Sequence, residues 1–389
     1  MQACTVPPEK EEPDRLVLRP ASFRDLPGWA ADDHAAALAA FGRSCVALAG
    51  RDAEEPLDYA SLGGRVGDWH ALCAAAVGVE EGADAARAFF ESRFSAYEAR
   101  NNGEAEGLFT GYYEPELRGA MQADARYAVP LYGRPDDLVS ADLGLFLPRL
   151  AGERIAGRVS GGTLRPYLTR AEIDEGALAE RGLELAWVDD PVDAFFLHIQ
   201  GSGRIAFEDG TTRRIGHVAT NGHDYLAIGR SLVERGAMTR EEVSMQAIRA
   251  WLAANPAEAR ALMQENRSFV FFRWLEDADG GPEAPGPVGA QGVTLTAGRS
   301  LAVDRRFLPL ALPIWLETAA PAPDLAAADR PVRRLMVAQD TGGAIRGPVR
   351  GDVYWGSGQE AGRVAGRMKH PGRYWLLLPH GLDVTAHLD

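Results

Sequence analysis

Two stretches near the start of the chain carry apolar residues at helical spacing. Residues 31–50 are rich in alanine, contain a candidate N-cap at Asp32 or Asp33, and end at Gly50, and such residues commonly mark the two ends of a helix. Residues 83–100 place four apolar side chains on one helical face: Ala86, Phe89, Phe90 and Phe94. This periodicity predicts a helix over each stretch, with the aromatic face packed in a core.

From residue 107 the pattern changes to short runs with strand-like alternation, broken by glycine and proline. The run LFTGYYEPELRG (108–119) alternates until its proline, which predicts a strand that ends there. The run FFLHIQGSGRIAF (195–207) predicts a β-hairpin with its turn at the Gly-Ser-Gly of 201–203. The middle of the chain is therefore expected to be rich in β-structure.

Residue pairs typical of helix starts predict three helices within this β-rich part. They are Thr169 with Glu172, Thr239 with Glu242 before a helix over 240–254, and Asn255-Pro256 before a helix to about Gln264. The last two helices follow each other directly and are expected to form an αα-hairpin.

After residue 287 the pattern is entirely β. A Pro- and Ala-rich loop at 319–331 separates two of the runs. The candidate strands are 293–296, 313–318, 333–338, 352–355 and 374–378. Short strands with Gly-rich turns favour a small barrel.

The size and charge of the chain narrow its function classes. Its 389 residues suggest two domains or one domain with an insertion, and 46% apolar residues can form sizeable cores. The formal net charge of −14 argues against a nucleic-acid partner and against a polybasic membrane-surface binder. No run of 18 apolar residues is present, so no membrane-spanning segment is expected. A sugar polymer remains open as a substrate.

The three cysteines give information about the cellular compartment in which the protein works. Gln-Ala-Cys before a Pro- and Glu-rich stretch at 1–20 resembles the end of a lipoprotein signal, with Cys4 as the lipidated residue; a plain leader or linker is the alternative. Cys45 and Cys73 fall in helical segments. A disulfide between them would suit an oxidising compartment, and two buried thiols are an equally compatible interpretation.

The densest candidate for chemistry is AQDTGGAIRGPVRGDVYWGSG (338–358). It holds Asp340 and Asp352, twelve residues apart, with four glycines between them. Two carboxylates in a loop where backbone can approach a ligand closely could flank a bond to be cleaved. Surface Asp and Gly are common, so this spacing alone is weak evidence.

Two further stretches offer groups for binding sugars. FTGYYEPEL (109–117) sets two tyrosines beside a Thr-Gly pair, and aromatic faces pack on apolar sugar faces; half-buried core tyrosines are the alternative. HIQGSGR (198–204) adds Gln200 and Ser202 but is not a Gly-x-Ser-x-Gly nucleophile elbow. The eight histidines match no zinc pattern, so neither a metal nor a cofactor is expected.

Taken together, these stretches resemble the MltA family of membrane-bound lytic murein transglycosylases. The resemblance covers roughly residues 20–380 and rests on six motifs in the family's order. They are FTGYYEP (109–115), DPVDAFFLHIQGSGRI (190–205), NGHDYLAIGRSL (221–232), NRSFVFFR (266–273), GAQGVTLTAGRSLAVDRRFLPLALPIWLE (289–317) and MVAQDTGGAIRGPVRGDVYWG (336–356).

The resemblance implies a mainly β fold with N-terminal helices, in which a double-psi β-barrel carries an inserted second β-rich domain. Glycan would lie in the groove between the two. The implied divisions are a leader at 1–20, the first part of the barrel domain at 21–112, the insert at 113–280 and the rest of the barrel domain at 281–389.

The resemblance also implies roles for single residues. Asp352 matches the family's single acid/base, Asp340 its partner in the Gly-rich loop, and Asp304 the third aspartate of the "three-aspartate" region. The substrate-binding candidates are Thr110, Gly111, Tyr112, Tyr113, Gln200, Ser202, Gly342, Gly343 and Ala344.

The implied activity is cleavage of peptidoglycan glycan strands in the periplasm, with an outer-membrane association. The lytic reaction closes the lactyl-bearing sugar onto its own 6-hydroxyl, so one carboxyl can serve as acid and then as base. Two rivals stay open: an inverting muramidase that uses Asp340 and Asp352 with water, and a wall-binding or loosening protein without catalysis.

Overall fold

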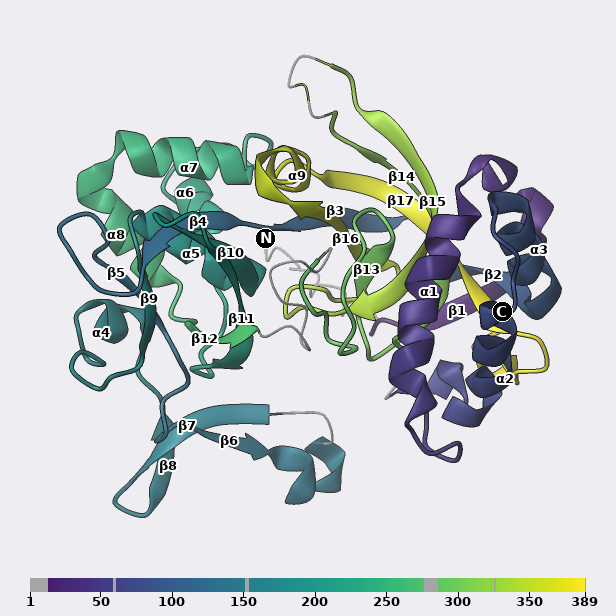
Figure 1. The fold of residues 1–389 in the computed structure, drawn as a ribbon, viewed down its shortest axis with the longest axis horizontal. Helices are drawn as coiled ribbons and strands as arrows, with labels where there is room; N and C mark the ends of the chain where they lie inside the picture. The colour runs from purple at the N-terminus through teal and green to yellow at the C-terminus, as the bar shows by residue number, and fades with distance from the viewer. Residues whose placement is uncertain are drawn as a thin grey trace, which may run out of the picture.

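The computed structural model describes residues 13–58, 61–150, 154–275, 286–322, 324 and 327–388. Figure 1 shows two lobes joined by long strands, with the N-terminal helices on one side and a slender arm below. None of the helices in these ranges has the length and apolarity needed to span a bilayer. The candidate lipidation site Cys4 lies outside the described residues.

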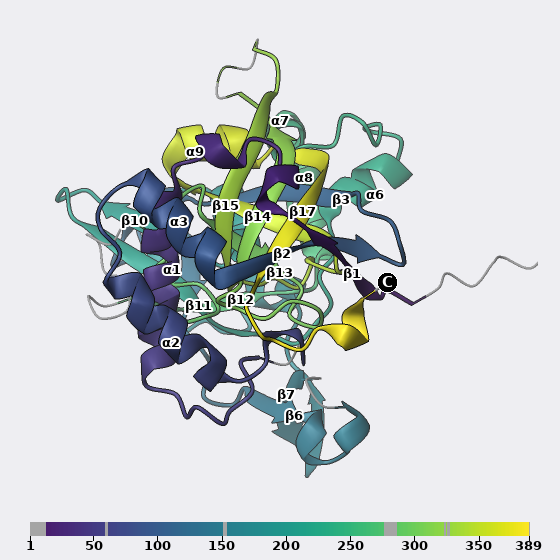
Figure 2. The ribbon, with the colours of Figure 1, turned by 90° about the vertical axis from the view of Figure 1, so that its right-hand side faces the viewer.

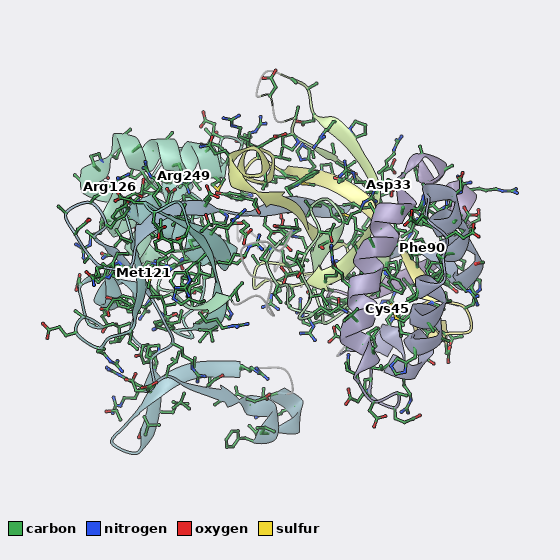
Figure 3. All side chains as sticks on the ribbon, viewed as in Figure 1. Asp33, Cys45, Phe90, Met121, Arg126 and Arg249 are labelled. Carbon is green, nitrogen blue, oxygen red and sulfur yellow. A yellow bond between two sulfur atoms is a disulfide. The ribbon has the colours of Figure 1, made fainter. Side chains whose placement is uncertain are left out.

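Three helices cover one side of the first lobe: α1 (His34–Ala49), α2 (Val66–Val77) and α3 (Ala83–Arg93). The expected first helix is confirmed, since the Asp33 side chain accepts from the Ala36 amide at 3.2 Å and Gly50 is the C-cap. Cys45 of α1 and Cys73 of α2 form a disulfide, with Cα atoms 5.2 Å apart. Figure 3 labels Cys45 on α1 and shows Phe90 in the same helical layer.

The predicted helix over 83–100 is only half right. It ends at Arg93, and β2 (Phe94–Asn101) follows at once, paired antiparallel with β1 (Leu16–Ala21) and with the last strand of the chain. These long-range ladders override a local sequence that suits a helix. Phe94 is still buried with Phe90, so the expected aromatic core is confirmed.

The first lobe is built around a closed β-barrel. Six strands pair in the order β3-β16-β13-β15-β14-β17, and β17 pairs back to β3. They are β3 (Gly107–Glu114), β13 (Ser300–Val303), β14 (Pro313–Ala320), β15 (Arg330–Asp340), β16 (Arg350–Ser357) and β17 (Lys369–Pro379). The expected small barrel is confirmed, and its double-psi connectivity stays a prediction.

Most barrel strands are buried on both faces, which explains their continuous apolar runs. Ile314, Trp315 and Leu316 are consecutive residues of β14 and all are fully buried. Trp315 packs edge-on against Trp29, with ring centroids 5.1 Å apart, in the layer of helices and turns outside the barrel. Its neighbours in the strand point to the opposite face, toward the interior. The barrel interior is therefore a packed core.

Four of the five strands predicted after residue 287 are confirmed, and one is wrong. Residues 293–296 contribute only an isolated bridge between Thr294 and Val288. The actual strand is β13, a run of four buried residues between β15 and β16. Because both of its faces are covered, it lacks the alternation that marks a half-exposed strand. A helix that was not predicted, α9 (Gly358–Ala365), follows β16.

The second lobe holds a six-stranded sheet in the order β12-β11-β10-β4-β9-β5. Its strands are β4 (Glu116–Ala120), β5 (Val129–Tyr132), β9 (Glu184–Val188), β10 (Ser202–Phe207), β11 (Thr212–Thr220) and β12 (Val270–Leu275). Its helices are α4 (Arg170–Asp174), α5 (Pro191–Gln200), α6 (Ile228–Glu234), α7 (Met245–Ala254) and α8 (Pro256–Glu265). The capping box of α4 and the α7–α8 hairpin are confirmed.

The predicted hairpin over 195–207 is wrong, because its first half is helix α5. Asp190 caps this helix by accepting from the Val192 and Asp193 amides, and Pro191 stands at its first turn. Gly201 ends it with φ of 79°, a left-handed C-cap. The helix start lies before the apolar run, so alternation within the run was misleading.

The helix predicted over 240–254 begins later than expected. Thr239 and Glu242 do form the predicted side-chain bonds, at 2.8 Å, but they close a turn. The helix α7 starts only after Ser244, whose hydroxyl accepts from the Ala247 amide at 3.1 Å. A serine cap nearer the apolar face therefore sets the boundary.

The arm consists of the three-stranded sheet β6-β7-β8 and projects from the second lobe in both views (Figures 1 and 2). Its strands are β6 (Val139–Asp142), β7 (Arg154–Ser160) and β8 (Thr163–Pro166). It is joined to the lobe partly through Ala156, which packs against the cluster containing Leu168 and Phe271.

A buried ion pair ties the two lobes together. Glu114 ends barrel strand β3, and both of its carboxylate oxygens accept from the Arg214 guanidinium of β11, at 2.8 and 3.0 Å. The exposed fractions of the two side chains are 0% and 1%. Ser357 at the end of β16 donates to the same carboxylate at 2.8 Å. This pair fixes the point where the chain passes from the first lobe to the second.

Candidate active site

Asp352 lies on β16 and is held by its neighbour on β3. The two strands are parallel, with Asp352 paired to Thr110. The Thr110 hydroxyl donates to Asp352 Oδ1 at 2.7 Å and itself accepts from Arg350 Nη2 at 2.9 Å. A carboxyl that is half-buried in this way has a fixed orientation and one oxygen, Oδ2, with no hydrogen bond from the described residues.

Asp340 ends β15 and receives three hydrogen bonds. Its Oδ1 accepts from the Ala290 and Thr341 amides, both at 2.9 Å, and its Oδ2 accepts from the Tyr112 hydroxyl at 2.8 Å. A carboxylate has about four lone-pair positions, so Asp340 is nearly saturated by the protein. Its arrangement suits a fixed negative charge that braces the loop.

The two aspartates flank one barrel strand. Ala302 of β13 pairs with Asp340 on one side and with Asp352 on the other. Since neighbouring strands lie about 4.8 Å apart, the two Cα atoms are roughly 10 Å apart. The two aspartate side chains lie on the same face of the sheet. Tyr112 donates a hydrogen bond to Asp340, and the charge of Asp352 also raises the pKa of Tyr112. The strand register thus brings together residues twelve apart in sequence.

Burial changes the acidity of both carboxyls. Burial raises the pKa of Asp352 from 3.8 to about 6; the charge of Arg350 and the hydroxyl of Thr110 oppose this rise, and the charge of Asp340 adds to it. Burial also raises the pKa of Asp340, against the hydrogen bonds that it accepts. Asp352 can therefore hold a proton near neutral pH and release it, as a general acid/base must.

The tyrosines of the FTGYY strand point to opposite sides of β3, as strand geometry requires. Tyr112 bonds Asp340 and packs on Tyr354, with ring centroids 5.3 Å apart. Tyr113 is buried against α9, where a Cβ on Gly362 would meet its ring at 2.9 Å. Gly111 between them is required by space, since a Cβ there would meet the Trp355 ring at 2.7 Å.

Two hollows meet at this strand. The first, with a volume of about 810 Å³, holds Asp340 and is called here the Asp340 cavity. Among the predicted binding residues it is lined by Tyr112, Gln200, Ser202, Gly342 and Gly343. The second, of about 250 Å³, is called here the Thr110 pocket and is lined by Thr110, Gly111, Tyr113 and Gln200. Gln200, at the end of α5, contributes to both, and its Oε1 accepts from the Tyr113 amide at 3.2 Å.

Two predicted residues lie apart from these linings. Asp352 lines neither the Asp340 cavity nor the Thr110 pocket. It is next to the Thr110 pocket because it accepts a hydrogen bond from Thr110, which lines that pocket. Ala344 is exposed in the loop after Asp340 and lines neither hollow.

The Gly-rich loop requires glycine for its backbone conformation at position 347, but not at positions 342 and 343. Gly342 and Gly343 lack a positive φ, and no backbone atom lies within 4 Å of a Cβ built at either position. Gly347 has φ of 107°, and its amide donates to Asp304 Oδ2 at 2.8 Å. Asp304, the third aspartate of the region, also pairs with Arg306. It therefore braces the loop from the end of β13.

Several residues of the site were not predicted. Arg350, two residues before Asp352, supports Thr110 and lowers the pKa of Asp352. His198 and His217 line the Asp340 cavity. His198 lies within the motif that contains Gln200, but a lone histidine in an apolar run carries no signal of its own. Within the described residues no group of three or more His, Cys, Asp or Glu could hold a metal.

Two family models match the chain. The family model described as "MltA specific insert domain" matches residues 108–273, and the "3D domain" model matches residues 299–378. The chain is 36% identical over 273 residues to the membrane-bound lytic murein transglycosylase A of Vibrio cholerae. That alignment covers 69% of this chain and 65% of the relative, so the match spans just under two thirds of the curated relative.

Solved structures match over a larger share. The crystal structure of a membrane-bound lytic murein transglycosylase from Agrobacterium tumefaciens has a TM-score of 0.82 and 36% identity, covering 93% of this chain and 98% of that one. The structure of Escherichia coli MltA with bound chitohexaose has a TM-score of 0.64 and 27% identity, covering 95% of each chain.

Proposed function

Because the chain belongs to the MltA family of membrane-bound lytic murein transglycosylases, we propose that it is a lytic transglycosylase of peptidoglycan. It cleaves the β-1,4 bond between N-acetylmuramic acid and N-acetylglucosamine and leaves 1,6-anhydromuramic acid ends. The observation that carries this proposal is Asp352, a carboxyl whose pKa burial raises to about 6 and which lies across strand β13 from Asp340, a residue in the wall of the Asp340 cavity.

The reaction needs one carboxyl acting twice. Protonated Asp352 gives its proton to the glycosidic oxygen as the bond from that oxygen to C1 of the muramic acid breaks. The ionised Asp352 then takes the proton of the C6 hydroxyl on the same sugar, whose oxygen forms the new bond to C1. Water takes no part, the carboxyl ends protonated again, and the pKa of about 6 suits both roles.

The hydrogen bonds of Asp340 and Asp352 support different roles for the two carboxyls. Asp340 already accepts hydrogen bonds from two backbone amides and from the Tyr112 hydroxyl. Its carboxylate therefore has little remaining capacity to accept a proton from water. Asp352 accepts a single hydrogen bond, at Oδ1, within the described residues. The inverting muramidase therefore lacks a suitable base, and Asp340 acts as a nearby negative charge that favours the protonated form of Asp352.

The cavity is suited to an uncharged sugar chain. The Asp340 cavity presents an aromatic hydroxyl, an amide and a hydroxyl from Tyr112, Gln200 and Ser202, and sugars are bound by such mixtures of rings and neutral polar groups. The Escherichia coli relative with bound chitohexaose supports glycan binding here. A binding module without catalysis would have no need of a carboxyl with a raised pKa.

The place of action follows from the substrate. Peptidoglycan lies outside the cytoplasm, and the disulfide between Cys45 and Cys73 suits an oxidising compartment. The relatives are named as membrane-bound. We therefore propose a periplasmic enzyme attached to the outer membrane through a lipid on Cys4.

The test is turnover of purified peptidoglycan by Asp352→Asn. The substitution keeps size and the acceptor for Thr110 but removes the proton donor, so the rate should fall by at least roughly 10²–10⁴-fold, while chitohexaose binding persists. Asp136→Asn, at an exposed turn, is the matched control and should retain the wild-type rate. Wild-type turnover by Asp352→Asn would refute the assignment.

A further inference from the structure

His198 is a buried histidine in the wall of the Asp340 cavity that the reaction scheme above does not use. It lies on α5, two residues before Gln200, and its exposed fraction is 7%. Its ring packs against two phenylalanine rings, with centroids 4.3 Å from that of Phe269 and 5.2 Å from that of Phe272. The ring is therefore held in one orientation at the edge of the cavity.

Arg170 determines which ring nitrogen of His198 carries the proton. Its Nη2 lies 3.1 Å from His198 Nδ1 and also donates to the Ser268 carbonyl at 2.8 Å, while its Nε donates to the Asn266 carbonyl at 3.1 Å. A guanidinium can only donate, so Nδ1 must accept. The neutral ring then carries its hydrogen on Nε2.

The same surroundings keep the ring neutral. Burial, and then the charge of Arg170, hold the pKa of His198 well below 6.5. Burial lowers the pKa of Arg170 only to about 10, so it stays charged. Within the described part of the chain no group accepts a hydrogen bond from Nε2. The ring therefore offers the cavity one uncharged donor in a fixed place.

We propose that the Nε2–H of His198 donates a hydrogen bond to the acetamido carbonyl of a bound sugar and so selects N-acetylated glycan. The inference rests on the glycan function proposed above. A carbonyl oxygen matches a neutral N–H donor, and the acetamido group is the strongest neutral acceptor on both murein sugars. Removing the acetyl group removes this carbonyl and leaves an amine, whose protonated form can accept no hydrogen bond and is repelled by the buried charge of Arg170.

The experiment measures binding by calorimetry, with the Asp352→Asn protein as background so that no cleavage occurs. The two ligands are chitohexaose and the same hexamer without its acetyl groups. We expect the Asp352→Asn protein to prefer the acetylated ligand. In His198→Phe, which keeps the aromatic packing, this preference should shrink by roughly 5- to 100-fold, the usual effect of leaving a buried hydrogen-bonding group, here the acetamido carbonyl, without its partner.

Two further variants separate recognition from packing. His198→Gln restores an N–H donor and should recover most of the preference. His34→Phe removes another buried histidine, packed on Trp29 in the barrel lobe, and should leave the preference unchanged. An equal preference in His198→Phe and in its parent overturns the inference, while failure of chitohexaose to bind at all overturns the proposed function as well.

A measurement on the unaltered side chain guards against misfolding of the variants. The Nε2–H proton of His198 is followed by NMR in ¹⁵N-histidine-labelled Asp352→Asn protein during titration with chitohexaose. A downfield shift that is absent with the deacetylated hexamer is expected. No change in this proton at saturating chitohexaose refutes the inference.

Discussion

Replacing Asp352 with asparagine should make the folded protein more stable at neutral pH, although it removes the proposed acid/base. The carboxyl has a folded-state pKa of about 6, raised from 3.8 chiefly by burial. A raised carboxyl pKa means that folding favours the protonated form. The contribution of protonated Asp352 to the free energy of unfolding is complete below pH 3.8 and is lost as the pH rises through about 6. Asparagine does not titrate and avoids this loss.

The size of the effect follows from the shift in proton affinity. A change from 3.8 to about 6 corresponds to about 3 kcal/mol above pH 6, at about 1.4 kcal/mol for each tenfold change. Because Asp352 is partly exposed to solvent, about 2 kcal/mol is a realistic expectation. The asparagine keeps an oxygen to accept from Thr110, so no hydrogen bond need be lost.

The assay is urea unfolding followed by tryptophan fluorescence, which reports on the barrel through the buried Trp315. Wild type, Asp352→Asn and the exposed control Asp136→Asn are compared at intervals from pH 4 to pH 8. The unfolding free energy of Asp352→Asn should exceed that of wild type by an amount that grows between about pH 4 and pH 6 and then levels off. A difference that is independent of pH, or that falls as pH rises, refutes the reasoning.

Three other outcomes are expected. The kcat/KM for glycan should fall as pH rises above about 6, because Asp352 must start protonated; a flat profile to pH 9 would contradict this. Tyr112→Phe removes the 2.8 Å bond to Asp340 and should lower kcat by about 10-fold, which corresponds to about 1.4 kcal/mol of transition-state stabilisation; an unchanged kcat would show that the bond is dispensable. The unfolding free energy of this variant should fall by about 1–3 kcal/mol, because the Asp340 carboxylate loses a donor. The disulfide between Cys45 and Cys73 closes a separation of 28 residues, so its loss in a double alanine variant should cost about 3–4 kcal/mol. Dithiothreitol should then destabilise wild type but leave that variant unaffected, and equal sensitivity would count against the bridge.

The sequence predicted two helices whose ends are marked by capping residues or proline. Asp33 and Gly50 bound α1, and Pro256 starts α8, much as the sequence indicated. The strand β13 could not be predicted in this way. All four of its residues are buried, and a short buried run is compatible with either a strand or a helix until its partners are known; here the partners are the distant strands β15 and β16. The helix α5, in contrast, has local start and stop signals in Asp190, Pro191 and Gly201, which the hairpin prediction overlooked.

The candidate active site was likewise predicted only in part. Its residue types and order were predicted through the resemblance to a family, and Asp340, Asp352 and Tyr112 do meet in the structure. The distances could not be predicted, because the bond from Thr110 to Asp352 joins residues 242 apart. The donor of His198 was missed for a related reason: its direction depends on Arg170, which is 28 residues away.

The central claim is that the glycosidic bond is broken without water. The most direct test digests purified peptidoglycan with the enzyme in H₂¹⁸O and identifies the new muramic acid ends by mass spectrometry. We predict ends that lack ¹⁸O, resist borohydride reduction and are lighter than reducing ends by one molecule of water. Reducing muramic acid ends that carry ¹⁸O would contradict the account and identify a hydrolase, and an absence of new ends would identify a binding protein.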